Sequence, residues 1–271
     1  AVVVVLVVAT GISTAMYLRA ERESARALTE SAKATEVSGF LKGMLAGVGP
    51  GVARGRDTAL LQEILTETDA RLSRDLGDQP EVEAVLRDVL ASTSVDMGDY
   101  EAGMTQARQS VALNSDVFGP ADHRTATAVA MVGRITMFLG DFATADSLLS
   151  WADSVVSAQL GSGSKAALEV RAARIENLSF AGQLDLSAEL AEDVLARKTG
   201  TANWGDDATL LTLFNLAQIR AEQQRYDEAD GLHQVVIPLL EDKWGTDHPN
   251  TLAARVSWGM TLTYAERYEE A

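Results

Sequence analysis

Hydrophobic positions recur with the period of an α-helix along most of this chain, and the pattern itself repeats every 42 residues. The turn-like string Gly-Asp-Tyr-Glu-Ala begins at residue 98 and returns, with variation, at 140, 182, 224 and 266. The constant spacing of the five copies predicts a tandem array of similar units, each too small to bury its own apolar face alone.

Small residues recur at fixed positions on both sides of each turn, and an aromatic residue usually follows the turn. Small side chains let two helices approach closely, so we expect each unit to be a pair of antiparallel helices. The third unit differs, because Ile175 takes a small position and Leu184 replaces the aromatic residue; we expect it to be looser than its neighbours. The expected helices span 83–97, 100–117, 125–139, 142–159, 167–181, 184–198, 209–223, 226–242 and 251–265.

The start of the first helix in each pair also has a recurring residue. Thr125, Thr209 and Thr251 share one phase of the repeat, and we expect each of them to cap its helix through the side-chain oxygen.

This arrangement of small residues and turns resembles the tetratricopeptide repeat. The common form of that repeat has about 34 residues, and the longer units here resemble those of kinesin light chain and its bacterial relatives. The resemblance covers roughly residues 83–271. It implies an all-α fold, a tetratricopeptide-type α-solenoid built as a right-handed superhelix of helix pairs, with a protein or peptide as its ligand.

The first 18 residues carry no charge, and a helix of this length spans about 27 Å, enough to cross the hydrocarbon core of a bilayer. We expect residues 1–18 to be the end of a transmembrane helix; a signal-peptide core and a buried core helix are the alternatives. Composition predicts a juxtamembrane helix at 19–46 and a Gly-rich linker at 47–56. A leading helix at 57–82 then caps the array at 83–271, which holds four full repeats and a truncated fifth.

The order of these segments, with the strings at 39–45 and 78–84, resembles the C-terminal half of bacterial membrane-anchored serine/threonine protein kinases that carry tetratricopeptide repeats. The resemblance implies a kinase domain before the span and a single-pass protein whose array is extracytoplasmic, for interaction or sensing. Because the chain starts at Ala1 and stops inside the fifth turn motif, we expect a longer parent protein. The alternative is a free-standing exported or membrane-anchored repeat protein used in envelope complex assembly.

Charge narrows the range of partners. The formal net charge is −16, and residues 57–271 hold 16 Lys and Arg against 35 Asp and Glu, a net charge of −19. Such a surface repels phosphate backbones, so we expect no nucleic-acid partner. The absence of cysteine excludes disulfides and thiol chemistry.

Short strings that resemble catalytic motifs are better explained by the repeat. Asp141 and Phe142 share the phase of the other turn motifs, and the string at 161–165 lacks the spacing of a phosphate-binding loop. The three histidines fall in different repeats, which argues against a shared metal site. We therefore expect no catalytic residue, cofactor or metal in this segment; an enzyme here is the third and least favoured hypothesis.

The first helix of each pair lines the concave face in folds of the tetratricopeptide type, so the phase of the repeat predicts a binding surface. Ala130, Ala172, Phe214 and Val256 occupy positions where some of these domains carry Lys or Asn to clamp a terminal carboxylate, which disfavours a carboxylate-terminal peptide. We expect a protein or peptide held by aromatic and Met anchors, with basic partners favoured; packing between helices is the alternative role of these residues. The predicted face comprises Arg134, Met137, Phe138, Glu176, Phe180, Leu211, Phe214, Gln218, Met260 and Tyr264.

Overall fold

The computed structural model describes residues 58–198 and 206–267, and the regular elements in these two ranges are all α-helices. The chain divides into two compact units, residues 1–86 and 87–271. The segments predicted as a transmembrane helix, a juxtamembrane helix and a linker lie outside the described residues. Among the helices that are described, none is both long enough and apolar enough to cross a membrane.

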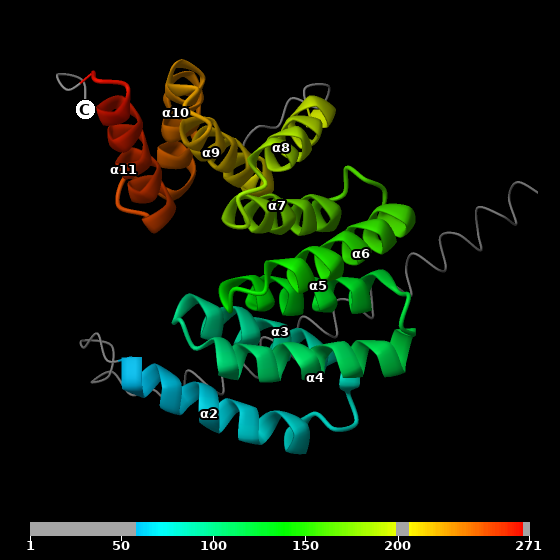
Figure 1. Ribbon diagram of the computed structural model, residues 1–271. Coiled ribbons are helices and arrows are strands. Elements are labelled where there is room, and N and C mark those ends of the chain that lie inside the picture. The colour runs from blue at the N-terminus through cyan, green and yellow to red at the C-terminus, as the bar shows by residue number, and fades with distance from the viewer. Residues whose placement is uncertain (1–57, 199–205, 268–271) are drawn as a thin grey trace, which may run out of the picture. The chain divides into compact units, whose positions relative to one another are not determined.

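From residue 80 onward, the helices follow one another along the chain as pairs (Figure 1). From the second pair onward, the first helices have 16 residues each, and the fully described second helices have 19. Short turns within and between the pairs complete the 42-residue period, so the helical assignment made from sequence is confirmed. The helices are α3 (Pro80–Asp96), α4 (Tyr100–Phe118), α5 (His123–Phe138), α6 (Phe142–Leu160), α7 (Lys165–Phe180), α8 (Leu184–Lys198), α9 (Asp207–Glu222), α10 (Tyr226–Trp244) and α11 (Pro249–Tyr264).

The range 57–82, expected as one leading helix, contains the described part of one helix and the start of another. Helix α2 (Thr58–Asp75) ends well before residue 82, and α3 already begins at Pro80. α2 ends 43 residues before the end of α4, close to one 42-residue period, so it lies near the register of a second helix.

Each turn within a pair closes in the same way. The residue at 98, 140, 182, 224 and 266 has a positive φ, and it is glycine in the first three turns, but Gln224 and Glu266 adopt φ 62° in the last two. The next backbone N–H reaches back to the last turn of the helix; for example, Asp141 donates to the carbonyl of Thr136 at 3.2 Å. This is the Schellman ending, which explains why glycine recurs at this position.

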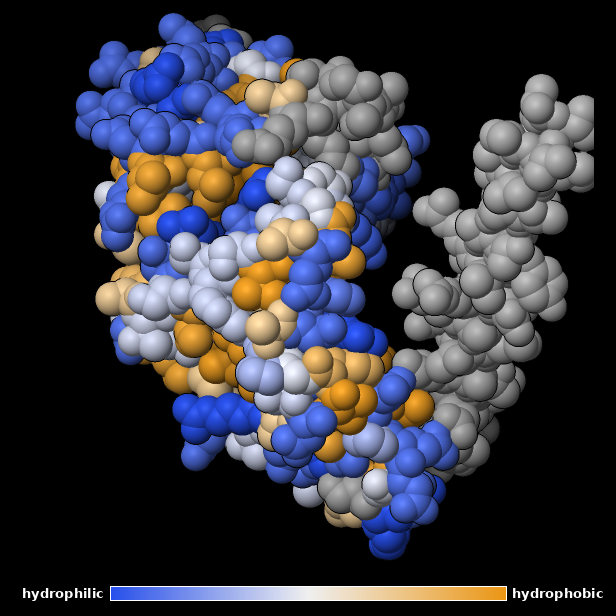
Figure 2. Space-filling view, turned by 90° about the vertical axis from the view of Figure 1, so that its right-hand side faces the viewer, coloured by the Kyte–Doolittle hydropathy of each residue, from blue (hydrophilic) through white to orange (hydrophobic). Residues whose placement is uncertain are grey.

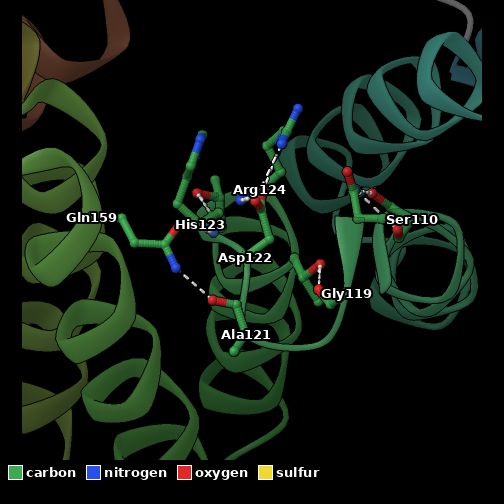
Figure 3. Close-up of polar contacts among 10 residues, drawn as sticks. Ser110, Gly119, Ala121, Asp122, His123, Arg124 and Gln159 are labelled. Atoms are coloured by element: carbon green, nitrogen blue, oxygen red, sulfur yellow. Dashed lines mark hydrogen bonds and ion pairs between the residues drawn. The ribbon is translucent and has the colours of Figure 1, made fainter. Parts of the chain in front are cut away.

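The first helices are capped three residues earlier than the sequence predicts. Asp122 accepts from the backbone N–H of Arg124 at 2.9 Å (Figure 3). Ser164, Asp206 and His248 hold the equivalent position in later repeats. The predicted caps Thr125, Thr209 and Thr251 lie inside the first turn and are buried. They are therefore packing residues, because only the residue before the helix has the extended backbone that capping requires.

The connection before α5 is also held from the next helix. Gln159 on α6 donates to the carbonyl of Ala121 at 2.6 Å and accepts from the backbone N–H of His123 at 3.0 Å (Figure 3). These bonds satisfy backbone groups that the turn leaves free, and they hold the connection between two repeats against the second helix of the later repeat.

The core is a series of clusters rather than one centre. One cluster joins α5, α6 and α7, the next joins α7, α8 and α9, and a third joins α9, α10 and α11. Each second helix is thus packed between two first helices. This nearest-neighbour arrangement is the expected consequence of units that bury apolar surface only against each other.

The third repeat is packed rather than loose at Ile175, which corrects the expectation from sequence. In the second repeat Gly133 faces Leu149 so closely that a Cβ on the glycine would lie 3.0 Å from the Leu149 Cγ. In the third repeat the sizes are exchanged, since Ile175 packs in a buried cluster with Ala191, the residue at the register of Leu149. The combined volume is conserved across the helix pair, so the core closes in both repeats.

Candidate functional site

The first helices of the second unit line a shared groove with a volume of about 640 Å³. α5 contacts α7, α7 contacts α9, and α9 contacts α11, whereas the closely contacting pairs in the described chain include none made of two second helices. First helices therefore form the inner layer of the unit, as expected from the resemblance. The groove is lined by α5, α7, α9 and α11 alone among the described elements.

The 42-residue period places side chains of different chemistry in line across this groove. Arg134, Glu176 and Gln218 occupy one register position on α5, α7 and α9, and all three line the groove. Residues one period apart lie on the same face of successive first helices, because each repeat has the same helix lengths and turns.

Six of the ten predicted residues line the groove: Arg134, Glu176, Phe180, Leu211, Phe214 and Gln218. Phe180 is the most accessible large apolar side chain among them, with 56% of its surface exposed. Phe214 is only 9% exposed and lies tilted against the buried ring of His233, with ring centres 6.4 Å apart. Phe214 thus belongs to the floor of the groove and Phe180 to its accessible wall.

The other four predicted residues are placed elsewhere. Met137 is 1% exposed, so its prediction as a ligand contact is wrong; it packs in the interior. Phe138 stacks on Tyr100 with ring centres 5.3 Å apart and is packed against the core between α3, α4 and α5. Met260 and Tyr264 are 51% and 61% exposed on α11 but do not line the groove.

Three acidic residues of the groove were missed by the sequence reasoning: Glu169, Asp207 and Glu222. Two of them carry a signal that the sequence already contained. Glu169 lies one period before Leu211, and Glu222 lies one period after Phe180. Moving one repeat period, 42 residues, before and after each predicted residue leads to both Glu169 and Glu222.

Burial and neighbouring charges set the electrostatics of the groove. Burial raises the pKa of the Glu176 carboxyl, and the positive charge of Arg134 acts in the opposite direction. Burial also raises the pKa of Glu222. Asp207 is paired with Lys243 at 2.5 Å, and Glu169 lies 3.7 Å from Lys165. The groove therefore combines an apolar floor with an excess of carboxylates.

No arrangement in the described ranges suggests catalysis or metal binding. Groups of three or more His, Asp or Glu side chains placed to hold a metal ion are absent from residues 58–198 and 206–267. His233, whose pKa burial lowers to about 4 against the effect of the Asp230 charge, lies behind the groove floor rather than in it.

Comparisons with known structures agree with this architecture. Nearly identical TPR-like repeats from Podosopora anserina, named after kinesin light chain, superpose with a TM-score of 0.54 at 20% identity, over 73% of this chain and 90% of that one. BtubC (BKLC) from P. vanneervenii gives a TM-score of 0.63 at 13% identity, over 79% of this chain and 87% of that one. The chain therefore has the fold of a tetratricopeptide-like repeat solenoid.

No family model matches the sequence, and no curated protein matches it. The similar structures are repeat proteins, and they give no support to the resemblance with membrane-anchored kinases.

Proposed function

We propose that residues 87–271 form a protein-interaction module that holds a peptide or protein segment in the groove of the first helices. The observation that carries the proposal is the groove itself, in which the exposed ring of Phe180 stands beside an apolar floor that includes Leu211 and Phe214. Its volume of about 640 Å³ is within the range of ligand sites, and accessible aromatic anchors are typical of binding hot spots.

Exposed apolar side chains outside the groove are weaker candidates for the peptide-binding surface. Hydrophobic side chains reach the surface as separate patches divided by hydrophilic ones (Figure 2). Leu186 on α8 and Val235 on α10 are 44% and 49% exposed, but neither lines the groove. Scattered apolar residues of this kind are normal on protein surfaces.

The groove proposal is tested by selecting random dodecapeptides displayed on phage against the 271-residue chain. We expect the Phe180→Ala, Leu211→Ala double variant to weaken binding of the selected peptides by about 10-fold or more, because it removes the exposed ring and part of the apolar floor. The matched control is Leu186→Ala with Val235→Ala, which removes two exposed apolar side chains outside the groove and should leave Kd unchanged. Circular dichroism verifies folding. Equal binding by all three proteins would reject the groove as the site.

We also propose that residues 1–18 tether the module to a membrane as a single-pass anchor and that the array is extracytoplasmic. The support is the uncharged run at 1–18 and the charged segment after it. The order of segments further supports a module that scaffolds or senses for a tethered serine/threonine kinase, with a role in envelope complex assembly as the alternative.

The membrane proposal has a direct test. The full-length chain should remain in the membrane pellet after alkaline carbonate extraction, because a spanning helix is held by burial of its apolar surface rather than by charge. Release into the supernatant would exclude the anchor.

A further inference from the structure

The groove carries an uneven distribution of charge, and this bears on which ligand it accepts. Two of its carboxylates are already matched, Glu169 by Lys165 and Asp207 by Lys243. Glu222 makes no hydrogen bond or ion pair with any described residue, and Glu176 has Arg134 as its electrostatic neighbour without a hydrogen bond to it. Glu176 and Glu222 are therefore the groove carboxylates without a salt bridge in the described structure.

The same two residues flank an accessible aromatic ring. Glu176 precedes Phe180 by one helical turn on α7, so both project from one face of that helix. Glu222 holds the register position of Phe180 on the neighbouring helix α9. Phe180 is 56% exposed and lines the groove together with both acids. Carboxylates that line a groove together with an accessible aromatic ring suit an organic cation such as guanidinium or ammonium.

The apolar part of the groove lies further along α9. Phe214 and Glu222 are eight residues apart on this helix, about 12 Å along its axis. An extended segment advances about 3.3 Å per residue, so it covers that distance in about four residues. A polypeptide can therefore place one side chain beside Glu222 and another over Phe214 and Leu211.

We propose, on the basis of the function proposed above, that the groove accepts a polypeptide segment whose Lys or Arg side chain lies between Glu176 and Glu222 against Phe180. A large apolar side chain about four residues away in the same segment contacts Leu211 and Phe214. A segment of this composition fits better than a nucleic acid, which the net charge of −19 on residues 57–271 repels.

The selection of phage-displayed dodecapeptides supplies the probe. Peptides that depend on Phe180 and Leu211 should be enriched in Lys or Arg, with a large apolar residue about four positions away. The Glu176→Gln, Glu222→Gln double variant should bind a synthetic copy of such a peptide about 10-fold more weakly, because it removes both carboxylates that face the cation. The loss should shrink when the basic residue of the peptide is replaced with Met.

The matched control is Glu101→Gln with Glu189→Gln, which changes the net charge by the same amount. Both residues are exposed on second helices, outside the groove. This control should bind within about twofold of the unaltered chain, because charges beyond about a Debye length are screened. An equal loss in both double variants would show an effect of overall charge and would overturn the inference.

The remaining outcomes separate the inference from the function on which it rests. Groove-dependent peptides without an excess of Lys or Arg, or with unchanged affinity for the Glu176→Gln, Glu222→Gln variant, would overturn the cation subsite and leave the binding module standing. If no selected peptide depends on Phe180 and Leu211, the proposed function is rejected and the inference falls with it.

Discussion

The substitution Asp153→Ala is expected to lower the free energy of unfolding by about 3 to 5 kcal/mol, since it leaves a buried guanidinium without its carboxylate. Arg171 on α7 is 8% exposed, and its Nε lies 3.0 and 3.1 Å from the two Asp153 carboxylate oxygens on α6. Ser157 and the carbonyl of Ser162 accept its other hydrogen bonds. These two neutral partners do not offset the charge that remains.

Urea unfolding followed by circular dichroism measures this effect, and Asp146→Ala is the matched control. Asp146 also lies on α6 and pairs with Arg174 on α7 at 2.8 Å, but the two side chains are 32% and 22% exposed. Its removal should cost less than about 1 kcal/mol, because solvent screens the charge that remains. Replacing the buried pair together, as Asp153→Leu with Arg171→Met, should recover most of the lost stability. Equal effects of the two single substitutions would contradict the argument.

The substitution Asp88→Asn is expected to raise the free energy of unfolding at pH 7 by up to about 3 kcal/mol. Asp88 lies on α3, and its Oδ1 is buried without a hydrogen-bond partner in the described structure. Burial raises the pKa of this carboxyl to about 6 from 3.8, against the lowering effect of a bond to Ser110. A difference of about two pKa units corresponds to roughly 3 kcal/mol between the protonated and ionised forms.

The sign of the pH dependence follows from which state binds the proton. Between pH 4 and 6 the folded state keeps Asp88 protonated while the unfolded state does not, so this group lowers stability as the pH rises. His233 acts in the opposite direction, because its pKa falls from 6.5 to about 4 in the folded state and stability is lost as the pH falls through that window. In the unaltered chain the two contributions partly cancel.

Urea unfolding between pH 4 and 7 tests this account. Asp88→Asn should remove the loss of stability that ionisation of Asp88 causes. The free energy of unfolding of the variant should therefore increase with pH more steeply than that of the unaltered chain. The two proteins should converge in stability near pH 4, where Asp88 is protonated in the folded state. A variant that is stabilised equally at every pH would show that the ionisation of Asp88 is not the cause.

The helices could be predicted closely from the sequence because the 42-residue repeat of hydrophobic and small residues is visible in the sequence without knowledge of tertiary contacts. The helix expected at 142–159 is Phe142–Leu160, and the one expected at 251–265 is Pro249–Tyr264. Helix starts were less accurate. A threonine in the first turn and an aspartate before it have similar capping propensity, and only the backbone conformation shows which of the two precedes the helix.

The groove could be predicted in part for the same reason. Side chains at equal register lie in line across the first helices, and Arg134, Glu176 and Gln218, which the sequence placed on one face, line the same groove. The exchange of size between Gly133–Leu149 and Ile175–Ala191 was missed, because it links positions on two different helices that only the packed pair brings together.

By itself, the sequence determined the unit of this protein, namely a 42-residue helix pair, and part of the face of α5, α7 and α9 that lines the groove. The tertiary structure decided how much of each side chain on that face is accessible. Phe214 and Val256 hold the same register, yet they are 9% and 64% exposed. Met137 was predicted as a contact and is buried. Exposure depends on which neighbouring helices cover a residue, and those neighbours come from other repeats whose side chains the local pattern does not specify.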